Sequence, residues 1–303
     1  MTTLKGQNLR ILFNSSGNRY QVIGKSTNCT VPLTGNTDDT STKDQVDMFS
    51  KPEIVLKSWS VQVDSLDVID TSVILNAINN STPFMLIWDE VDTADNQTAQ
   101  AAAYARKGQA YLNDVTFNWN DRENSTKQLQ FTGIGQLEKV STAPEMDIVP
   151  DDGAYTKGQF VRLFLGSDNS AVPAKIVAAA KSLSLHISVT LEDATTKDTV
   201  GDWQVQEPTG ISFDITSDAL VKSGDTITST VQGQDFATIE SIYEASTPVR
   251  FQIANTSGAN NRTKGAVICS GSVVVTQLTL NAPFQNATFQ TQLTGYGPYI
   301  VAA

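Results

Sequence analysis

Apolar and polar residues alternate along several short stretches, and this period of two predicts strands with one buried face. The clearest cases are residues 58–64 (SWSVQVD) and 210–216 (GISFDIT). The apolar positions are Trp59, Val61 and Val63 in the first stretch, and Ile211, Phe213 and Ile215 in the second. The polar positions are Ser60, Gln62 and Asp64, and then Ser212, Asp214 and Thr216. We therefore predict two strands whose polar side chains point away from the core.

A helical period occurs in two other places. Residues 72–78 (SVILNAI) and 235–245 (DFATIESIYEA) gather apolar side chains at spacings of three and four, which predicts one short amphipathic helix in each. Both helices are expected to stop at a Ser-Thr-Pro sequence, because proline disfavours helical geometry in the residue before it. The predicted buried faces are Val73, Ile74, Ala77 and Ile78 in the first helix, and Phe236, Ile239, Ile242 and Tyr243 in the second.

The chain repeats itself. Residues 124–135 (NSTKQLQFTGIG) and 286–297 (NATFQTQLTGYG) share Asn, Thr, Gln and Gly positions in register. Three further matches follow the same order in both halves: KGQNLRILF with KGQFVRLFL, NNSTPF with EASTPV, and KGQAYL with KGAVIC. Collinear matches of this kind indicate duplication. We therefore predict two domains, residues 1–146 and 147–303, with a linker in the Pro-, Asp- and Gly-containing segment 138–156.

Each half is expected to contain the same series of elements. About seven strands, a polar hairpin and one helix fit into roughly 150 residues. The predicted fold class is mainly β, with two tandem antiparallel β-sandwich or open-barrel domains, each flanked by one short α-helix. Further strands are expected at 9–13, 28–33, 84–88, 110–119 and 127–133, and then at 160–165, 185–191, 249–253, 266–280 and 288–294; the polar hairpins lie at 34–45 and 192–199.

The repeated stretches carry the clearest chemical pattern. Gln128 and Gln130 share one face of the first predicted strand, and Gln290 and Gln292 share one face of the second, opposite the apolar positions. Such a face is either the solvent side of a sheet or the lining of an aqueous channel. An amide lining would stay wet without holding phosphate groups.

Composition narrows the possible functions. The net charge is −11 and the pI is about 4.5, which argues against a protein that grips nucleic acid by its phosphates. The first residues show no apolar signal segment, and no apolar run reaches the length of a membrane span. Cys29 and Cys269 both lie in strand-like settings, so we expect two reduced, buried thiols.

Catalytic and metal-binding patterns are lacking. The single histidine, His186, alternates with apolar residues and is expected to be a structural strand residue. Two cysteines and one histidine do not supply a zinc site, and the acidic hairpin of residues 34–45 does not match a calcium loop. Asp64 and Asp67 could form a glycosidase pair, although surface charge explains them more simply. We expect no enzyme, no metal and no cofactor.

Taken together, the strand order, the helix and the closing TGIG and TGYG sequences resemble phage major tail tube proteins. The second half is the more similar, through residues 189–220 with their acidic, Thr-rich hairpin and GISFDIT strand. The resemblance implies a structural virion protein whose rings stack into a tube, through which DNA passes without specific binding. Two fused tube domains imply rings of three chains with pseudo-hexameric symmetry, and contacts with the terminator, tape measure and tip proteins of a tail assembled in the host cytoplasm.

In that arrangement the non-core positions of the repeated strands face the channel. These candidates are Ser60, Gln62, Asp64, Gln128, Gln130, Ser212, Asp214, Thr216, Gln290 and Gln292. The hairpins would contact neighbouring subunits, and the longer segment 89–108 of the first half is expected on the outside or at a ring contact. Two alternatives remain open: the tube of a contractile injection system, and a β-sandwich adhesin or carbohydrate-binding module of a phage particle or cell surface.

Overall fold

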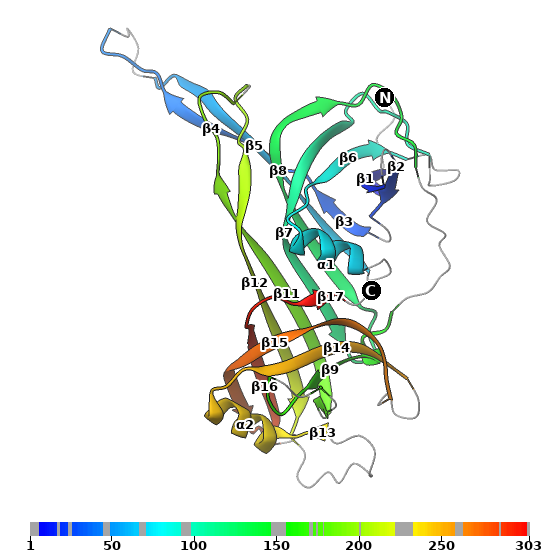
Figure 1. The fold of residues 1–303 in the computed structure, drawn as a ribbon. Helices are drawn as coiled ribbons and strands as arrows, with labels where there is room; N and C mark the ends of the chain where they lie inside the picture. Colours follow the sequence, from blue (N-terminus) through cyan, green and yellow to red (C-terminus); the bar gives the residue numbers. More distant parts are fainter. Residues whose placement is uncertain are drawn as a thin grey trace.

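Two lobes of antiparallel β-sheet make up the structure, each with one α-helix at its side (Figure 1). This computed structural model describes residues 6–16, 19–23, 26–44, 49–66, 71–91, 98–146, 156–169, 172–173, 175–177, 179–199, 201–221, 233–257, 263–284 and 286–301. The elements of the first half are a 3-10 turn (Gly6–Asn8), β1 (Leu9–Ser16), β2 (Arg19–Val22), β3 (Ser26–Thr30), β4 (Leu33–Asp39), β5 (Pro52–Leu66), α1 (Thr71–Asn79), β6 (Phe84–Glu90), β7 (Arg106–Asn120) and β8 (Thr126–Lys139). Those of the second half are a 3-10 turn (Gly158–Phe160), β9 (Val161–Leu165), β10 (Lys175–Val177), β11 (Ala180–Asp193), β12 (Gln206–Leu220), β13 (Gly233–Gln234), α2 (Phe236–Ala245), β14 (Val249–Ser257), β15 (Thr263–Asn281), β16 (Thr288–Gly295) and β17 (Ile300–Val301).

Strands pair in the same order in both halves. In the first half the order is β2-β1-β6-β7-β8-β5, with β3 and β4 on the outer side of β5. In the second half it is β10-β9-β14-β15-β16-β12-β11. The mainly antiparallel fold expected from the sequence is therefore present, with two α-helices in the described part of the chain.

Irregularities in the sheets also occur at matching places. Asn113 is an extra residue where β7 pairs with β8, and Thr276 is an extra residue where β15 pairs with β16. The register also shifts after Ser26 in β3 and after Ala180 in β11. A bulge of this kind bends its strand and re-aims the side chains beyond it, so both halves bend at equivalent points.

One strand pairing joins the halves. The second part of β7 pairs with β11, from Asn120 opposite Ser182 to Asp114 opposite Ser188. The apolar side of this junction belongs to a single core cluster that includes residues of both halves. Its buried members at the junction include Val115, Phe117, Trp119, Leu185 and Ile187.

The repeated glycines have the same two roles in each half. The first glycine lies flat under an aromatic ring, since a Cβ atom on Gly133 would come within 2.1 Å of Trp59 and one on Gly295 within 2.4 Å of Phe213. The second glycine adopts the left-handed conformation, with φ of 66° at Gly135 and 78° at Gly297. The TGIG and TGYG sequences match because both halves need the same two glycines at this place.

Several expectations need correction. Helix α1 buries Ile74, Leu75 and Ile78 but leaves Val73 exposed, and α2 buries Ile239 and Ile242 but leaves Tyr243 exposed. The first polar hairpin is present as expected, and its paired part is β4 with the first half of β5, from Pro52 to Trp59. Cys29 is half-buried, whereas Cys269 is fully buried, and both thiols are free.

Two other segments are only partly described. The Pro-, Asp- and Gly-containing segment begins inside β8, and its residues 147–155 lie outside the described residues, as do residues 92–97 of the longer segment. Buried Asp89 fixes the described end of that longer segment, because its carboxylate accepts hydrogen bonds from the N–H groups of Glu90, Ala101 and Ala102.

A glycine substitution tests the ring packing. We expect Gly133→Ala and Gly295→Ala each to lower the free energy of unfolding by about 1–3 kcal/mol, because the added methyl group forces the aromatic ring from its position. Chemical denaturation would measure the change. Gly210→Ala in β12 is the matched control, because its nearest atoms would lie 3.9 Å away. A loss at Gly210 as large as at Gly133 would contradict the role given to the rings.

Candidate functional site: a polar sheet face, two hairpins and two strand edges

All ten polar positions singled out from the sequence lie on one face of the joined sheet. Residues directly opposite each other in an antiparallel pair share a face, so the register shows which side chains are neighbours. Gln62 lies opposite Gln130, and Thr216 lies opposite Gln292. The remaining pairs are Ser60 with Thr132, Asp64 with Gln128, Asp214 with Thr294, Ser212 with Ser188, and Gln290 with Asp218. None of the ten is buried.

The junction of the halves fills the centre of this face with residues that the sequence analysis missed. Asp114, Thr116 and Asn118 of β7 lie between β8 and β11, opposite Ser188, His186 and Ser184 respectively. The alternation in residues 110–119 would have indicated this polar face, but the pairing of β7 with a strand of the other half has no local signal. The face therefore runs without a break across β5, β8, β7, β11, β12 and β16.

Hydrogen bonds tie many of these side chains to one another. His186 Nε2 lies 2.8 Å from a carboxylate oxygen of Asp114, across the junction of the halves. His186 is thus a strand residue as expected, but it sits on the polar face and not among the apolar residues. Similar bonds join Ser182 to Asp218, Ser188 to Ser212, Thr132 to Asn113, Thr294 to Asp214, and Asn28 to Asp64.

The side chains of this face are either uncharged or acidic. Asp64, Asp114, Asp214 and Asp218 carry its carboxylates, and none of the face positions named above is Lys or Arg. Basic side chains are the groups that hold nucleic acid by its phosphates. This face, which we call the polar sheet face, is therefore suited to contact with water and to weak interaction with phosphate.

Two hairpins extend the sheet on one side of the molecule (Figure 1). The β4–β5 hairpin and the β11–β12 hairpin meet where Lys57 N–H donates to the Asp202 carbonyl and Gln204 N–H donates to the Lys57 carbonyl. The Lys57 and Asp202 side chains form an exposed ion pair there, 3.6 Å apart. The base of the β4–β5 hairpin is thus attached to the loop at the tip of the β11–β12 hairpin.

The same carboxylate turn begins the loop of each hairpin. Asp39 accepts a hydrogen bond from Ser41 N–H at 2.9 Å, and Asp193 accepts one from Thr195 N–H at 2.9 Å. Hydrogen bonds from the hydroxyl and the N–H of Ser41 hold the pKa of Asp39 below its ordinary value of 3.8, and those of Thr195 do the same for Asp193.

The two ends of the sheet that carries the polar sheet face are strand edges with no partner strand among the described residues. Strand β15 pairs with β16 alone from Val274 to Asn281, because β14 begins at Val249, opposite Val273. At the other end of the sheet, β3 and β4 pair only with β5. An unpaired edge presents a row of free backbone donors and acceptors to another strand.

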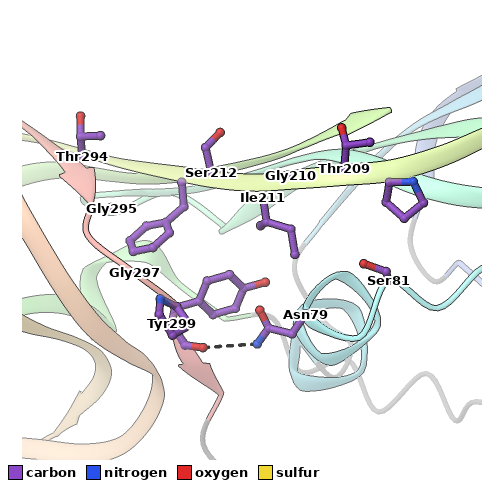
Figure 2. A pocket seen from close by; sticks show the side chains of 13 residues that line it. Asn79, Ser81, Thr209, Gly210, Ile211, Ser212, Thr294, Gly295, Gly297 and Tyr299 are labelled. Carbon is purple, nitrogen blue, oxygen red and sulfur yellow. Dashed lines mark hydrogen bonds between the residues drawn. The ribbon is translucent and has the colours of Figure 1, made fainter. Parts of the chain in front are cut away.

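A cavity of about 710 Å³ lies where the second half meets the end of α1 (Figure 2). Tyr299 O–H donates to the Leu75 carbonyl at 3.2 Å, and Asn79 Nδ2 donates to the Tyr299 carbonyl at 3.3 Å. Burial raises the pKa of Tyr299, which is the only ionisable side chain among the lining residues. The described lining residues include no Asp, Glu, His, Lys, Arg or Cys.

The rest of the described residues also lack a metal-binding cluster and a membrane-spanning helix. No three His, Cys, Asp or Glu side chains there are grouped so as to hold a metal ion. No helix in that part of the chain has the length and apolar character needed to cross a membrane. Asp67, one member of the carboxylate pair considered above, lies outside the described residues.

No protein-family model and no curated protein matches this chain. Among solved structures, a chain in the virion of a native gene transfer agent particle aligns with a TM-score of 0.37 and 14% identity, covering 49% of this chain and 99% of that one. A chain in the tail of an empty gene transfer agent particle gives 0.35 and 15%, covering 48% and 96%. The SPP1 tail tube gives 0.34 and 12%, covering 50% and 84%. No family assignment follows from similarities of this strength.

The carboxylate turns predict how the hairpins respond to acid. Because the pKa values of Asp39 and Asp193 are lowered, the stabilisation of the turns is fully present above 3.8 and is lost as the pH falls through the lowered values. We expect hydrogen exchange at the Ser41 and Thr195 amides, measured by NMR, to accelerate in that acidic range.

A variant provides the control for this response. Asp193→Ala should accelerate exchange at Thr195 already at neutral pH, and Asp198→Ala in the same loop should not. Exchange rates corrected for intrinsic pH dependence that stay constant on acidification would contradict the role of these carboxylates.

Proposed function

We propose that the protein is the major structural subunit of a phage tail tube, which stacks in rings and encloses the channel for genome passage. The polar sheet face carries this proposal. It spans both halves without a break, exposes amide and hydroxyl groups, and places no Lys or Arg at its named positions. A channel wall for DNA needs this chemistry, because it must remain hydrated without binding phosphates.

Under this proposal the ten polar positions predicted from the sequence face the channel. The apolar side of the same strands is covered by the rest of each lobe, as shown by the buried Val61, Phe131, Phe213 and Leu293. A sheet with one buried side and one hydrated side can form a wall, provided that its edges are closed by other strands.

Residues 1–146 and 147–303 are proposed to be two copies of one tube domain. The matching strand order, bulges and glycine packing support this duplication. Three chains would then supply six equivalent wall segments to a ring. The other partners would be the terminator, tape measure and tip proteins of the tail, and the location would be the virion tail after assembly in the host cytoplasm. The protein would have no enzymatic role.

Electron microscopy and mass measurement test this function together. Negative-stain images over a concentration series should show rings or tubes with six-fold appearance, while mass photometry should give three chains per ring. Six chains per ring would keep the tube but contradict two wall segments per chain. Monomers at all concentrations that bind glycans in a screen would instead support an adhesin or carbohydrate-binding module.

Lysine substitutions test the chemistry of the face. Assembled tubes of the wild-type protein should retain little short duplex DNA in a pelleting assay. Tubes of the double variant Gln130→Lys, Gln290→Lys should retain at least ~10-fold more at low salt, and the gain should fall steeply as salt rises. Both glutamines are exposed.

Two outer lysines serve as the matched control for that assay. The double variant Ala237→Lys, Val172→Lys adds the same two charges at exposed positions away from the polar sheet face, and it should leave retention in the tube unchanged. Equal retention by this control and by the glutamine variant would place the glutamines outside the channel.

A further inference from the structure

We infer that two copies of this chain join edge to edge, with β15 of one copy paired to β3 and β4 of the next. The arrangement would repeat the β7–β11 junction that joins the halves within one chain. This inference rests on the proposed function, because it specifies the contact by which the proposed rings close.

The equivalent positions can be fixed from the structure itself. Trp59 and Phe213, each packed on its glycine, are 154 residues apart, which relates β3, β4 and β5 to β11 and β12. The bulge residues Asn113 and Thr276 are 163 residues apart, which relates β7 to β15. With these two offsets, each residue pair of the β7–β11 junction predicts one residue pair between the β15 edge of one copy and the β3–β4 edge of the next.

The conversion gives a definite register. Within the chain, Val115 lies opposite Ile187 and Phe117 lies opposite Leu185. Adding 163 to the β7 numbers and subtracting 154 from the β11 numbers pairs Leu278 with Leu33 and Leu280 with Val31. Each of the four side chains in the intermolecular pairs is apolar, as are their counterparts in the internal junction.

Side chains at the internal junction are buried, whereas their counterparts at the two open edges are exposed, as expected if a partner strand is missing there. Phe117 and Ile187 are 0% and 1% exposed inside the chain. Their counterparts Leu280 and Leu33 are 51% and 63% exposed. Side chains at equivalent places in equivalent lobes are thus buried where a partner strand lies beside them and open where none does.

The backbone of the β3–β4 edge is compatible with a new strand. Pro32 lacks an N–H group, and such a residue would interrupt pairing if it faced outward. Its carbonyl instead accepts from Ser60 N–H of β5 at 3.2 Å, so Pro32 faces inward. The backbone groups of a strand alternate in direction, and Val31 and Leu33 therefore face the open side.

The helices show the same contrast. Within the chain, α1 contacts the C-terminal segment of the second half through Tyr299 and Leu75. Helix α2 ends at the same Ser-Thr-Pro sequence as α1, so Tyr243 corresponds to Ile78. Tyr243 is 46% exposed and Ile78 is 3% exposed, which leaves α2 open on the side where the next copy would lie.

The two edges are different surfaces, so the contact is head to tail. A head-to-tail contact closes into a ring if its rotation permits and otherwise forms an open filament. No third kind of surface is needed to add a further copy, because each chain offers one edge of each type.

Disulfide trapping tests the register. Thr34 and Gln277 correspond to Ser188 and Asp114, which lie directly opposite each other in the last pair of the junction. Thr34, two residues after the inward-facing Pro32, also directs its backbone groups inward, so the pair between copies is a non-hydrogen-bonded one. Such positions have Cα atoms about 4.5 Å apart, within the range of a disulfide. The variant Thr34→Cys, Gln277→Cys, with Cys29→Ser, should give disulfide-linked trimers on a non-reducing gel. The control Thr34→Cys, Asn281→Cys, four residues out of register, should give none.

Charge substitutions test the edges by complementation. Leu33→Lys and Leu280→Lys should each abolish assembly at concentrations where the wild-type protein assembles fully. A mixture of the two variants should form one-to-one dimers through the two intact edges but no rings. Val172→Lys, at an exposed apolar position outside both edges, should assemble normally.

The results separate this inference from the proposed function. Wild-type rings combined with no cross-link in the matched pair, or normal assembly of both edge variants, would overturn the inference and leave the tube. Cross-linked chains that form no rings or tubes at any concentration would support the edge contact and overturn the tube. Monomers without cross-links would overturn both.

Discussion

The pairing of β7 with β11 is the contact on which the rest of the structure depends. These two strands belong to different halves, yet seven residues of each lie in unbroken antiparallel register. Without this pairing, each half would expose one strand edge and the apolar side chains beside it. With it, the two lobes share one core cluster and one continuous polar sheet face.

The period of two links that core to that face. Along β7, Val115 and Phe117 are fully buried, while Asp114 and Thr116 between them point to the other side. Because successive side chains of a strand point to opposite faces, burial of these residues at the junction places their neighbours on the exposed face. A polar wall on one side follows directly from an apolar core on the other, and the choice of amide, hydroxyl and carboxylate groups sets what the wall can bind.

Much of this architecture could be predicted from the sequence, because the signals are local. Alternation in residues 58–64 and 210–216 identified the strands and the side of each that is polar, although Ile211, expected on the core side, is 41% exposed. The duplicated TGIG and TGYG sequences indicated a repeat, and their glycines proved to have paired packing roles. Local patterns of this kind are set by steric and solvation preferences of single segments.

The remainder depends on contacts between distant segments. Nothing near Asp114 or His186 in the sequence shows that β7 and β11 are neighbours. The exposed side of α2 was also mispredicted, because Tyr243 has the helical spacing of a core residue. Spacing places a side chain on a face of the helix, and only the tertiary arrangement decides whether anything covers that face.

An unpaired edge with exposed leucines would ordinarily be a site of aggregation. Proteins usually protect such edges with charged side chains, bulges or an outward-facing proline. Here Pro32 faces inward, and the exposed residues Leu33 and Leu280 are apolar and not charged. The bulges at Asn113 and Thr276 occur at equivalent points of β7 and β15. Beyond its bulge β7 has a second partner strand, β11, whereas β15 pairs only with β16 there. A chain that contains one completed junction and the two separate sides of another is arranged as a repeating unit. Its open edges are then best explained as the place where the next unit joins.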